Sequence, residues 1–282
     1  MTTASLSIPR SRRVGLRAAA RHTLAITVRN AMRFIRLPQL LIFHTVQPVI
    51  FLLLFTFAFG GAIELIPGVT AAGGYINYLI PGILVQQSVF GSIGAALGLT
   101  EDLRAGVLDR FRSLPIARSA VLAGRTFADL GRNTVVALIM VGLGTAFGWR
   151  PAGGLGSAIL AVGLALLFGY AFSWVMAAIG LATKTPEAAE AAGFLPLFPL
   201  VFASSAFLPT ATMPGWLEAF ANVQPISIVA NAVRALTIDE GARVALGLAD
   251  PASLVVQALL WIVGIVVVCG PLAVRLYRRI SG

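Results

Sequence analysis

The chain has 282 residues, of which 58% are hydrophobic and 11% are charged, and its formal net charge is +10. Soluble domains usually contain about 45–50% apolar and about 25% charged residues, so a soluble fold of this size could not bury the apolar excess. The basic residues lie beside long apolar runs and lack the aromatic interleaving of a nucleic-acid site, which argues against nucleic acid and favours a lipid bilayer as partner. We therefore predict an all-α, polytopic membrane protein.

The N-terminal arm combines arginines with scattered apolar residues. Residues 1–12 are expected to be disordered, and residues 13–38 are predicted to form an amphipathic helix at the membrane interface. The arginines form two rows at helical spacing, which are Arg13, Arg17 and Arg21, and Arg29, Arg33 and Arg36. Because these rows are rotated by roughly 120° in an ideal helix, we expect either a break or a wide polar face.

Six apolar runs are long enough to cross a bilayer, which takes roughly 20 residues. They cover about residues 40–60, 78–99, 131–149, 157–181, 191–209 and 254–274, within a six-span domain at 39–282. Eighteen of the 21 lysines and arginines fall on one side of this arrangement, and only Arg150, Arg234 and Arg243 fall on the other. The excess predicts two cytoplasmic termini in a plasma membrane, and we expect a bacterial source.

The interiors of the predicted spans contain no Asp, Glu, Lys or Arg. Ion-coupled transporters keep ionisable groups at depth, so this absence argues against a secondary transporter. His44 and Cys269 are expected to serve packing rather than proton relay, metal or redox chemistry. Lys184 does not belong to a phosphate-binding loop. We predict no catalytic residue and no metal or cofactor bound by this chain.

Between the second and third predicted spans, residues 101–114 have the pattern of an amphipathic helix. Thr100 is a suitable N-cap, and Pro115 stops the helix. The apolar stripe consists of Leu103, Val107, Phe111 and Leu114. The pattern alone also fits a solvated interfacial helix.

The spans also carry glycines and isolated polar groups. Gly91, Gly94 and Gly98 share one face of the second span and predict close helix contact. The candidates for a substrate path are Gln86, Gln87, Ser88, Trp174, Ser204, Ser205 and Phe207. Each of them could equally form a structural interhelical hydrogen bond or belong to an aromatic belt.

Residues 210–240 are too apolar for an ordinary loop but contain no run long enough to span. Two short helices, at 216–223 and 226–238, are expected to dip into the outer leaflet on either side of Pro225. Trp216 starts the first helix. Glu218 and Arg234 are the most polar positions of the two helices, and the simple interpretation is that their charged ends extend to the membrane surface, which is called snorkelling.

Three blocks of sequence carry a resemblance to a known family. They are LDRFRSLPIARSAVLAGRTxAD at 108–129, TKTPEAA at 183–189, and FLPxxxMPGWLxxFAxxQPISxxxxAxRAL at 207–236. In this order they resemble the permeases of type-2 ABC exporters, and the daunorubicin-resistance type in particular. The resemblance covers about residue 15 to the end, and its first and third blocks are the specific ones.

The resemblance implies a dimer of six-span permeases, formed with a second copy or a paralogous permease. Two copies of a separate ATPase subunit would bind ATP and Mg. The helix at 101–114 would then be a coupling helix seated in the ATPase, the N-terminal helix an elbow helix, and the outer pair a re-entrant segment that aids release. The implied ATPase contacts are Glu101, Asp102, Arg104, Asp109, Arg110 and Arg112, while Arg118 and Arg125 would support the start of the third span.

The expected function is ATP-driven export of a hydrophobic or amphipathic compound, a drug-like molecule or a lipid, from the cytoplasm or inner leaflet. An exporter of a lipid-linked glycan or polyketide lipid is an alternative within this class. Two functions outside this class stay open, which are those of a secondary transporter and of a non-transporting membrane assembly protein.

Overall fold

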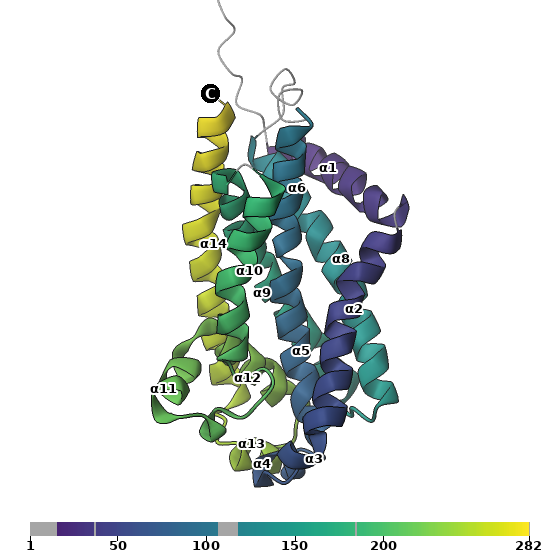
Figure 1. Ribbon diagram of the computed structural model, residues 1–282, viewed down its shortest axis with the longest axis vertical. Coiled ribbons are helices and arrows are strands. Elements are labelled where there is room, and N and C mark those ends of the chain that lie inside the picture. Colours follow the sequence, from purple (N-terminus) through teal and green to yellow (C-terminus); the bar gives the residue numbers. More distant parts are fainter. Residues whose placement is uncertain (1–15, 37, 107–117, 184, 282) are drawn as a thin grey trace, which may run out of the picture.

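The computed structural model of the chain describes residues 16–36, 38–106, 118–183 and 185–281. All regular structure in these ranges is helical, as predicted, and the long helices run side by side between two ends of the molecule (Figure 1). α1 (Leu16–Arg36) lies obliquely across the end where the C-terminus is found. This helix is continuous over its 21 residues, so no break separates its arginine rows. The proposed disordered segment at 1–12 lies outside the described residues.

The first crossing and the second pack together. The first consists of α2 (Pro38–Leu54), the π-helical η1 (Phe55–Phe59) and α3 (Gly60–Ile63), and the short α4 (Pro67–Ala71) follows at the far end. The second consists of α5 (Tyr75–Gly91) and α6 (Ile93–Arg104). In the most apolar part of α5–α6, 89% of the residues are buried, whereas only 17% of the residues are buried in the most apolar part of the last helix. The second crossing is therefore the centre of the bundle.

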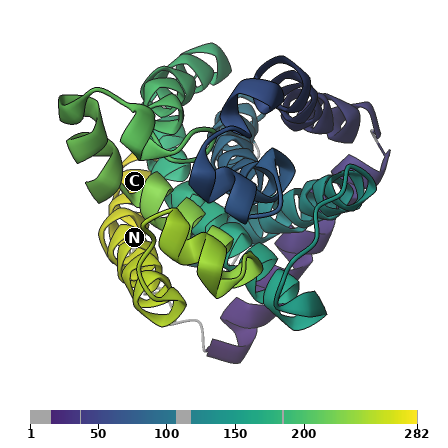
Figure 2. The same ribbon diagram turned by 90° about the horizontal axis from the view of Figure 1, so that it is seen from below.

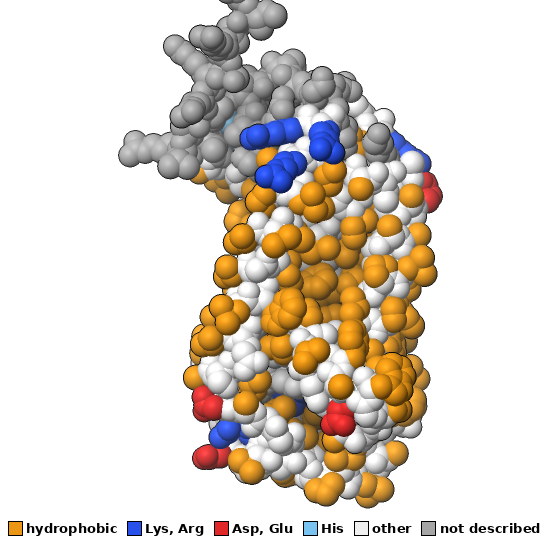
Figure 3. Space-filling model, turned by 90° about the vertical axis from the view of Figure 1, so that its left-hand side faces the viewer, with side chains coloured by type: hydrophobic (Ala, Val, Ile, Leu, Met, Phe, Trp, Pro, Cys, Tyr) orange, Lys and Arg blue, Asp and Glu red, His pale blue; other side chains and the backbone are white. Residues whose placement is uncertain are grey.

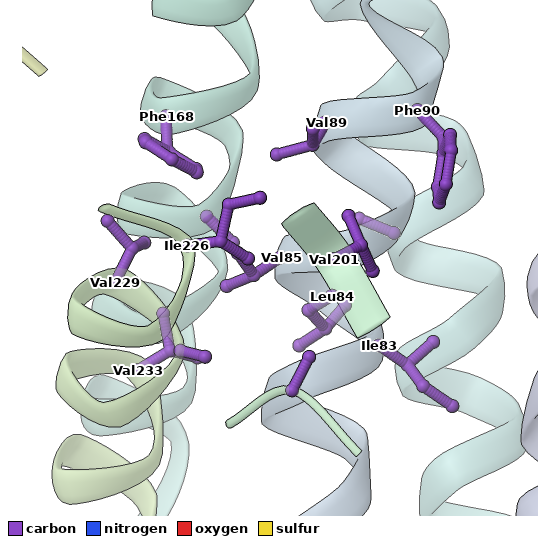
Figure 4. Packing of buried hydrophobic residues seen from close by; sticks show 14 of the residues in the cluster. Ile83, Leu84, Val85, Val89, Phe90, Phe168, Val201, Ile226, Val229 and Val233 are labelled. Atoms are coloured by element: carbon purple, nitrogen blue, oxygen red, sulfur yellow. The ribbon is translucent and has the colours of Figure 1, made fainter. Parts of the chain in front are cut away.

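Two long helices, α8 (Arg118–Ala146) and α9 (Gly154–Thr183), pack against this centre. A third, α14 (Pro251–Ser281), packs mainly against α9. Val85 and Val89 of α5 lie among Phe168 of α9 and Ile226 and Val229 of α12 (Pro225–Thr237) (Figure 4). Lipid tails are as apolar as these side chains, so close packing rather than removal from water holds such a core together.

α10 (Pro186–Phe202) is shorter than the long helices of the bundle. Thr185 caps the start of this helix, since its side-chain oxygen accepts a hydrogen bond from the Ala188 N–H. Pro186 occupies the first helical position. The helix ends at Phe202, and turns follow it. The predicted span at 191–209 is therefore helical only as far as Phe202, because residues 203–209 are not helical.

The far end of the bundle is closed by short helices. They are η2 (Thr210–Thr212), α11 (Gly215–Val223), α12 and α13 (Glu240–Ala245). α11 and α12 match the two predicted short helices, and Pro225 opens the second of them. Trp216, on α11, is 75% exposed.

Five helices among the described residues are long and apolar enough to cross a membrane: His44–Ile63, Tyr75–Arg104, Leu122–Ala146, Gly154–Thr183 and Pro251–Arg279. This number is one fewer than predicted, because α10 has only 17 residues. The face seen in Figure 3 has a broad hydrophobic middle, with Lys and Arg gathered at one end and further charges near the other. Such a band is typical of a polytopic membrane protein.

Candidate functional site

The predicted ATPase contacts begin on the last turns of α6. The predicted helix start at Thr100 is wrong, because α6 runs through this residue to Arg104. The Thr100 hydroxyl donates back to the carbonyls of Ala96 and Leu97 instead of capping a new helix. Gly106 then adopts φ +64°, a left-handed conformation that suits glycine after a helix end. Asp109, Arg110 and Arg112 lie outside the described residues.

Two of the predicted ATPase contacts pair within the chain. Asp102 forms an ion pair of 3.2 Å with Arg29 of α1. Arg104 donates two hydrogen bonds, of 3.0 and 2.7 Å, to the Glu187 carboxylate of α10. Glu101 is exposed. The end of α6 is thus tied to α1 on one side and to α10 on the other. Glu187 was not predicted as a site residue, although it belongs to the block TKTPEAA.

A buried ionic cluster lies on α8. The Asp129 carboxylate is 3.1 Å from an Arg132 guanidinium nitrogen and 3.7 Å from Arg125, and the side chains of Asp129 and Arg132 are each 1% exposed. The sequence pattern places these groups before or at the edge of the third span. In the structure they belong to one continuous helix with it, so charged groups do lie on the buried face of this crossing.

The glycine face of α5–α6 accommodates this cluster. A Cβ atom on Gly98 would lie 1.4 Å from an Arg125 guanidinium nitrogen, and one on Gly94 would lie 2.4 Å from an Arg132 nitrogen. Arg125 donates to the Gly94 carbonyl at 3.2 Å, and Arg132 donates to the Gly91 carbonyl. The glycines were predicted to bring helices into contact. Their observed role is to leave room for arginine side chains that bind the exposed helix carbonyls.

Most predicted path residues have a structural role. Ser204 accepts a hydrogen bond from the Ala206 N–H, and Ser205 bonds Ser227 and Asn231 of α12. Ser88 donates to the Leu84 carbonyl and accepts from the Gln87 amide. Trp174 packs in a second core with α14 residues. The hydrogen bonds satisfy the serine side chains in the bundle interior, whereas the Trp174 indole nitrogen is buried without a hydrogen-bond partner among the described residues. Gln86, Gln87, Trp174 and Phe207 therefore stay path candidates.

Arg234 on α12 is fully buried, so the snorkelling explanation is wrong. Its guanidinium donates to the carbonyls of Tyr78 and Ser205 at 3.1 and 2.9 Å, and to the Asn231 side-chain oxygen at 2.6 Å. It also lies 3.6 Å from the centre of the Tyr78 ring. Arg234 therefore links α5, α12 and the turns after α10.

The same turns lie directly on α5. A Cβ atom on Gly82 would lie 1.7 Å from the Ala206 carbonyl oxygen, so only glycine allows this approach. The Tyr75 hydroxyl donates to the Phe207 carbonyl at 2.8 Å, and the Gln224 amide donates to the Leu200 and Ala203 carbonyls. Backbone groups released by the end of α10 are thus bound by side chains, which is the condition for irregular backbone at membrane depth.

An aromatic ladder joins the first crossing to α10. We define it as Phe51, Phe55 and Phe59 on one side and Phe194, Phe198, Phe202 and Phe207 on the other. The rings of Phe55 and Phe207 stack at 4.3 Å with an interplanar angle of 5°, and Phe51 approaches Phe202 at 5.8 Å. In Figure 1, α10 lies to the left of α5 and the first crossing to its right, and Figure 2 shows the same helices from below. Phe198 is 43% exposed, so part of the ladder faces outward.

A small polar cavity lies beside the ladder. Its volume is about 30 Å³, and it is lined by His44, Gln47, Pro48, Gln86, Gln87, Phe90, Gly91, Asn133 and Val136. Phe90 connects the two features, because its ring lies 5.5 Å from that of Phe194. Within the described residues there is no group of His, Cys, Asp and Glu that could hold a metal.

Comparison with known proteins identifies the family. The profile of the family described as "ABC-2 type transporter" matches residues 21–238. The chain belongs to this family. This ABC-2 chain is 35% identical over 257 residues to the "Daunorubicin resistance ABC transporter permease protein DrrB1" of Streptomyces coeruleorubidus. The aligned region covers 91% of this chain and 86% of that protein. The family resemblance inferred from the three sequence blocks is confirmed.

Two further relatives extend the comparison. The "Probable doxorubicin resistance ABC transporter permease protein DrrC" of Mycobacterium tuberculosis (strain CDC 1551 / Oshkosh) is 28% identical over 285 residues, 99% of this chain and 98% of that protein. The "Putative transport permease ycf38" of Pyropia yezoensis is 28% identical over 222 residues, 75% of this chain and 72% of that protein. The region matched by the family profile includes the ionic cluster, the aromatic ladder and Arg234.

Proposed function

We propose that this chain is the membrane-spanning subunit of an ATP-driven exporter that moves a hydrophobic or amphipathic compound out of the cytoplasm or the inner leaflet. The observation that carries the proposal is an aromatic ladder, partly exposed, on a bundle of the ABC-2 type transporter family. A partner ATPase, in two copies, would bind ATP and Mg and supply the energy. A second permease copy, or a paralogous one, would complete the transport unit.

The proposed topology has six crossings and cytoplasmic termini. α1 and the C-terminus lie at the same end of the bundle, which requires an even number of crossings (Figure 1). Five helices qualify by length and composition, so α10 would supply the sixth crossing. Its 17 residues span about 26 Å at 1.5 Å per residue, and the buried turns after it would cover the remaining depth. The end with α1 would face the cytoplasm because most basic residues lie there.

Coupling to the ATPase is proposed to act through the end of α6. Glu101 and the segment at 107–114, with Asp109, Arg110 and Arg112, would contact the ATPase. The Arg29–Asp102 and Arg104–Glu187 pairs would pass a displacement of α6 to the elbow helix α1 and to α10. Since α10 carries Phe194, Phe198 and Phe202 of the aromatic ladder, movement there would alter the proposed path.

The proposed cargo is a flat aromatic or acylated amphiphile. Relatives are named for resistance to daunorubicin and doxorubicin, and the ladder offers stacking surfaces along the first crossing and α10. Scattered amides rather than charges line this region, which suits a molecule with few charged groups. The outer segment at 210–240, with Trp216 and Glu218 on α11, would aid release.

Replacing Phe198 with alanine tests the path. A stacked aromatic pair contributes about 0.5–1.5 kcal/mol, which corresponds to roughly a two- to tenfold change in affinity. We expect the half-saturating concentration of a planar aromatic cargo to rise by that factor in vesicles that contain the exporter complex. Leu195→Ala is the matched control, since Leu195 is 70% exposed on the same helix but is not part of the ladder. Equal kinetics for the Phe198 variant and the control would show that cargo does not follow the ladder.

A further inference from the structure

The polar cavity at the α2–α5–α8 junction has an unusual composition for a membrane interior. Its lining brings together His44 and Gln47 of α2, Gln86 and Gln87 of α5, and Asn133 of α8. All five can hydrogen-bond, and three separate elements of the fold supply them. Side chains of this kind inside a membrane bundle usually bond to one another across helices. Here, within the described residues, Gln87 is the only one of the five with a side-chain partner, and this partner is Ser88 of the same helix.

Gln86 is the side chain that sets this cavity apart. It is 0% exposed, and neither its amide nitrogen nor its amide oxygen has a hydrogen-bond partner among the residues that the structure describes. Burial of an amide without partners is costly, and a ligand group or a water in the cavity would satisfy it. Its neighbour Gln87 already donates to the Ser88 hydroxyl at 3.0 Å.

We infer that this cavity is a subsite for a neutral hydrogen-bonding group, a hydroxyl or a carbonyl, which binds the Gln86 amide. The volume of about 30 Å³ admits one such group or a few waters, since a cavity needs about 10–15 Å³ to hold one water. It does not admit a whole amphiphile. The ligand would therefore place only its polar group here.

The aromatic ladder indicates where the rest of the ligand would lie. Phe90 lines the cavity and also packs on Phe194 of the ladder. An amphiphile with its ring system along the ladder could thus reach Gln86 with a hydroxyl. This inference rests on the proposed function, because the ligand is then the exported compound. The same hydrogen-bonding chemistry is available to water, and the experiment separates these two sources.

The test compares two probes that differ in one hydroxyl, 1-pyrenebutanol and 1-butylpyrene. Their binding to the purified full-length chain in lipid nanodiscs is followed by pyrene fluorescence. We expect the wild type to bind the alcohol about two- to tenfold more tightly, the range for one neutral hydrogen bond. Gln86→Met keeps the length of the side chain and removes both polar atoms, so it should abolish the preference while 1-butylpyrene still binds.

Gln257→Met is the matched control, because Gln257 lies exposed on α14. It should retain the preference of the wild type. If Gln86→Met does not fold, Gln47→Met on the opposite wall of the cavity provides a second variant, with a reduced preference expected.

The outcomes separate the subsite from the path. Equal binding of the two probes by the wild type, or a preference that persists in Gln86→Met, overturns the subsite and leaves water as the ligand of Gln86. In that case 1-butylpyrene still binds along the ladder. Failure of both probes to bind wild type would overturn the aromatic path and, with it, the subsite.

Discussion

Asparagine in place of Asp129 is expected to destabilise the folded chain by about 3–5 kcal/mol, the usual cost of removing one partner from a buried ion pair. Asp129 lies between two buried arginines, and its carboxylate is 3.1 Å from Arg132. The amide keeps the shape of the side chain but removes its charge, so two guanidinium groups would remain close together without this carboxylate. Thermal unfolding of the purified protein in a mild detergent measures the effect.

Glu190→Gln provides the control for this prediction, since it makes the same type of charge removal at an exposed position of α10. It should shift the unfolding midpoint little, as surface substitutions generally change stability by less than about 0.5 kcal/mol. If the Asp129 variant unfolds at the same temperature as the Glu190 variant, the cluster does not stabilise the α8 contact with α5–α6.

Methionine at position 234 is the second change with a large expected effect. Arg234 donates to three acceptors, the carbonyls of Tyr78 and Ser205 and the side-chain oxygen of Asn231. The Ser205 carbonyl keeps the Tyr78 hydroxyl as a donor, and the Asn231 oxygen keeps the Ser205 hydroxyl. Hydrogen bonds from a charged group contribute about 1.5–3 kcal/mol, so we expect a loss of at least about that size. The turns after α10 should also become accessible, which limited proteolysis between residues 203 and 214 would detect.

Arg243→Met is the comparison for Arg234. Arg243 pairs at 3.4 Å with Glu240, which is 84% exposed, and such pairs contribute about 0–1 kcal/mol. Wild-type stability and wild-type proteolysis of the Arg234 variant would mean that the guanidinium is not what holds α5, α12 and the turns together.

The crossings could be predicted from the sequence because lipid demands long apolar runs, and such runs are visible without a structure. α2, α5, α8, α9 and α14 all overlap predicted spans. The predicted ends of the helices were less accurate. α6 passes through Thr100 because the threonine hydroxyl bonds its own helix, an alternative to capping that is open to this residue type.

Arg125, Asp129 and Arg234 show why polar residues near the spans were misjudged. Their charges are tolerated at buried positions because glycines 94 and 98, or the carbonyls of a broken helix, lie opposite them. Such partners come from segments far apart in the chain. Hydropathy and spacing within one segment cannot identify them, and a charge therefore looks like a span boundary or a snorkelling side chain.

Only part of the candidate site could be predicted from the sequence, because some of its residues come together only in the fold. Gln86, Gln87 and Phe207 were identified because polar and aromatic groups within a span are conspicuous in sequence. His44, Gln47 and Asn133 join Gln86 only through the packing of α2 and α8 on α5. The i, i+4 spacing of Phe194, Phe198 and Phe202 was visible, but its relation to the first crossing depends on the fold.

In the proposed exporter this chain would form the transport path and a partner would hydrolyse ATP. The most direct test of this claim is ATP hydrolysis in lipid, measured for the purified chain alone and for its complex with the co-purifying ATPase. The claim predicts no ATP binding by the chain alone and stimulation of the complex by aromatic amphiphiles. Saturable ATP binding by the chain alone, or stimulation by a free hydrophilic sugar and by none of the amphiphiles, would contradict it.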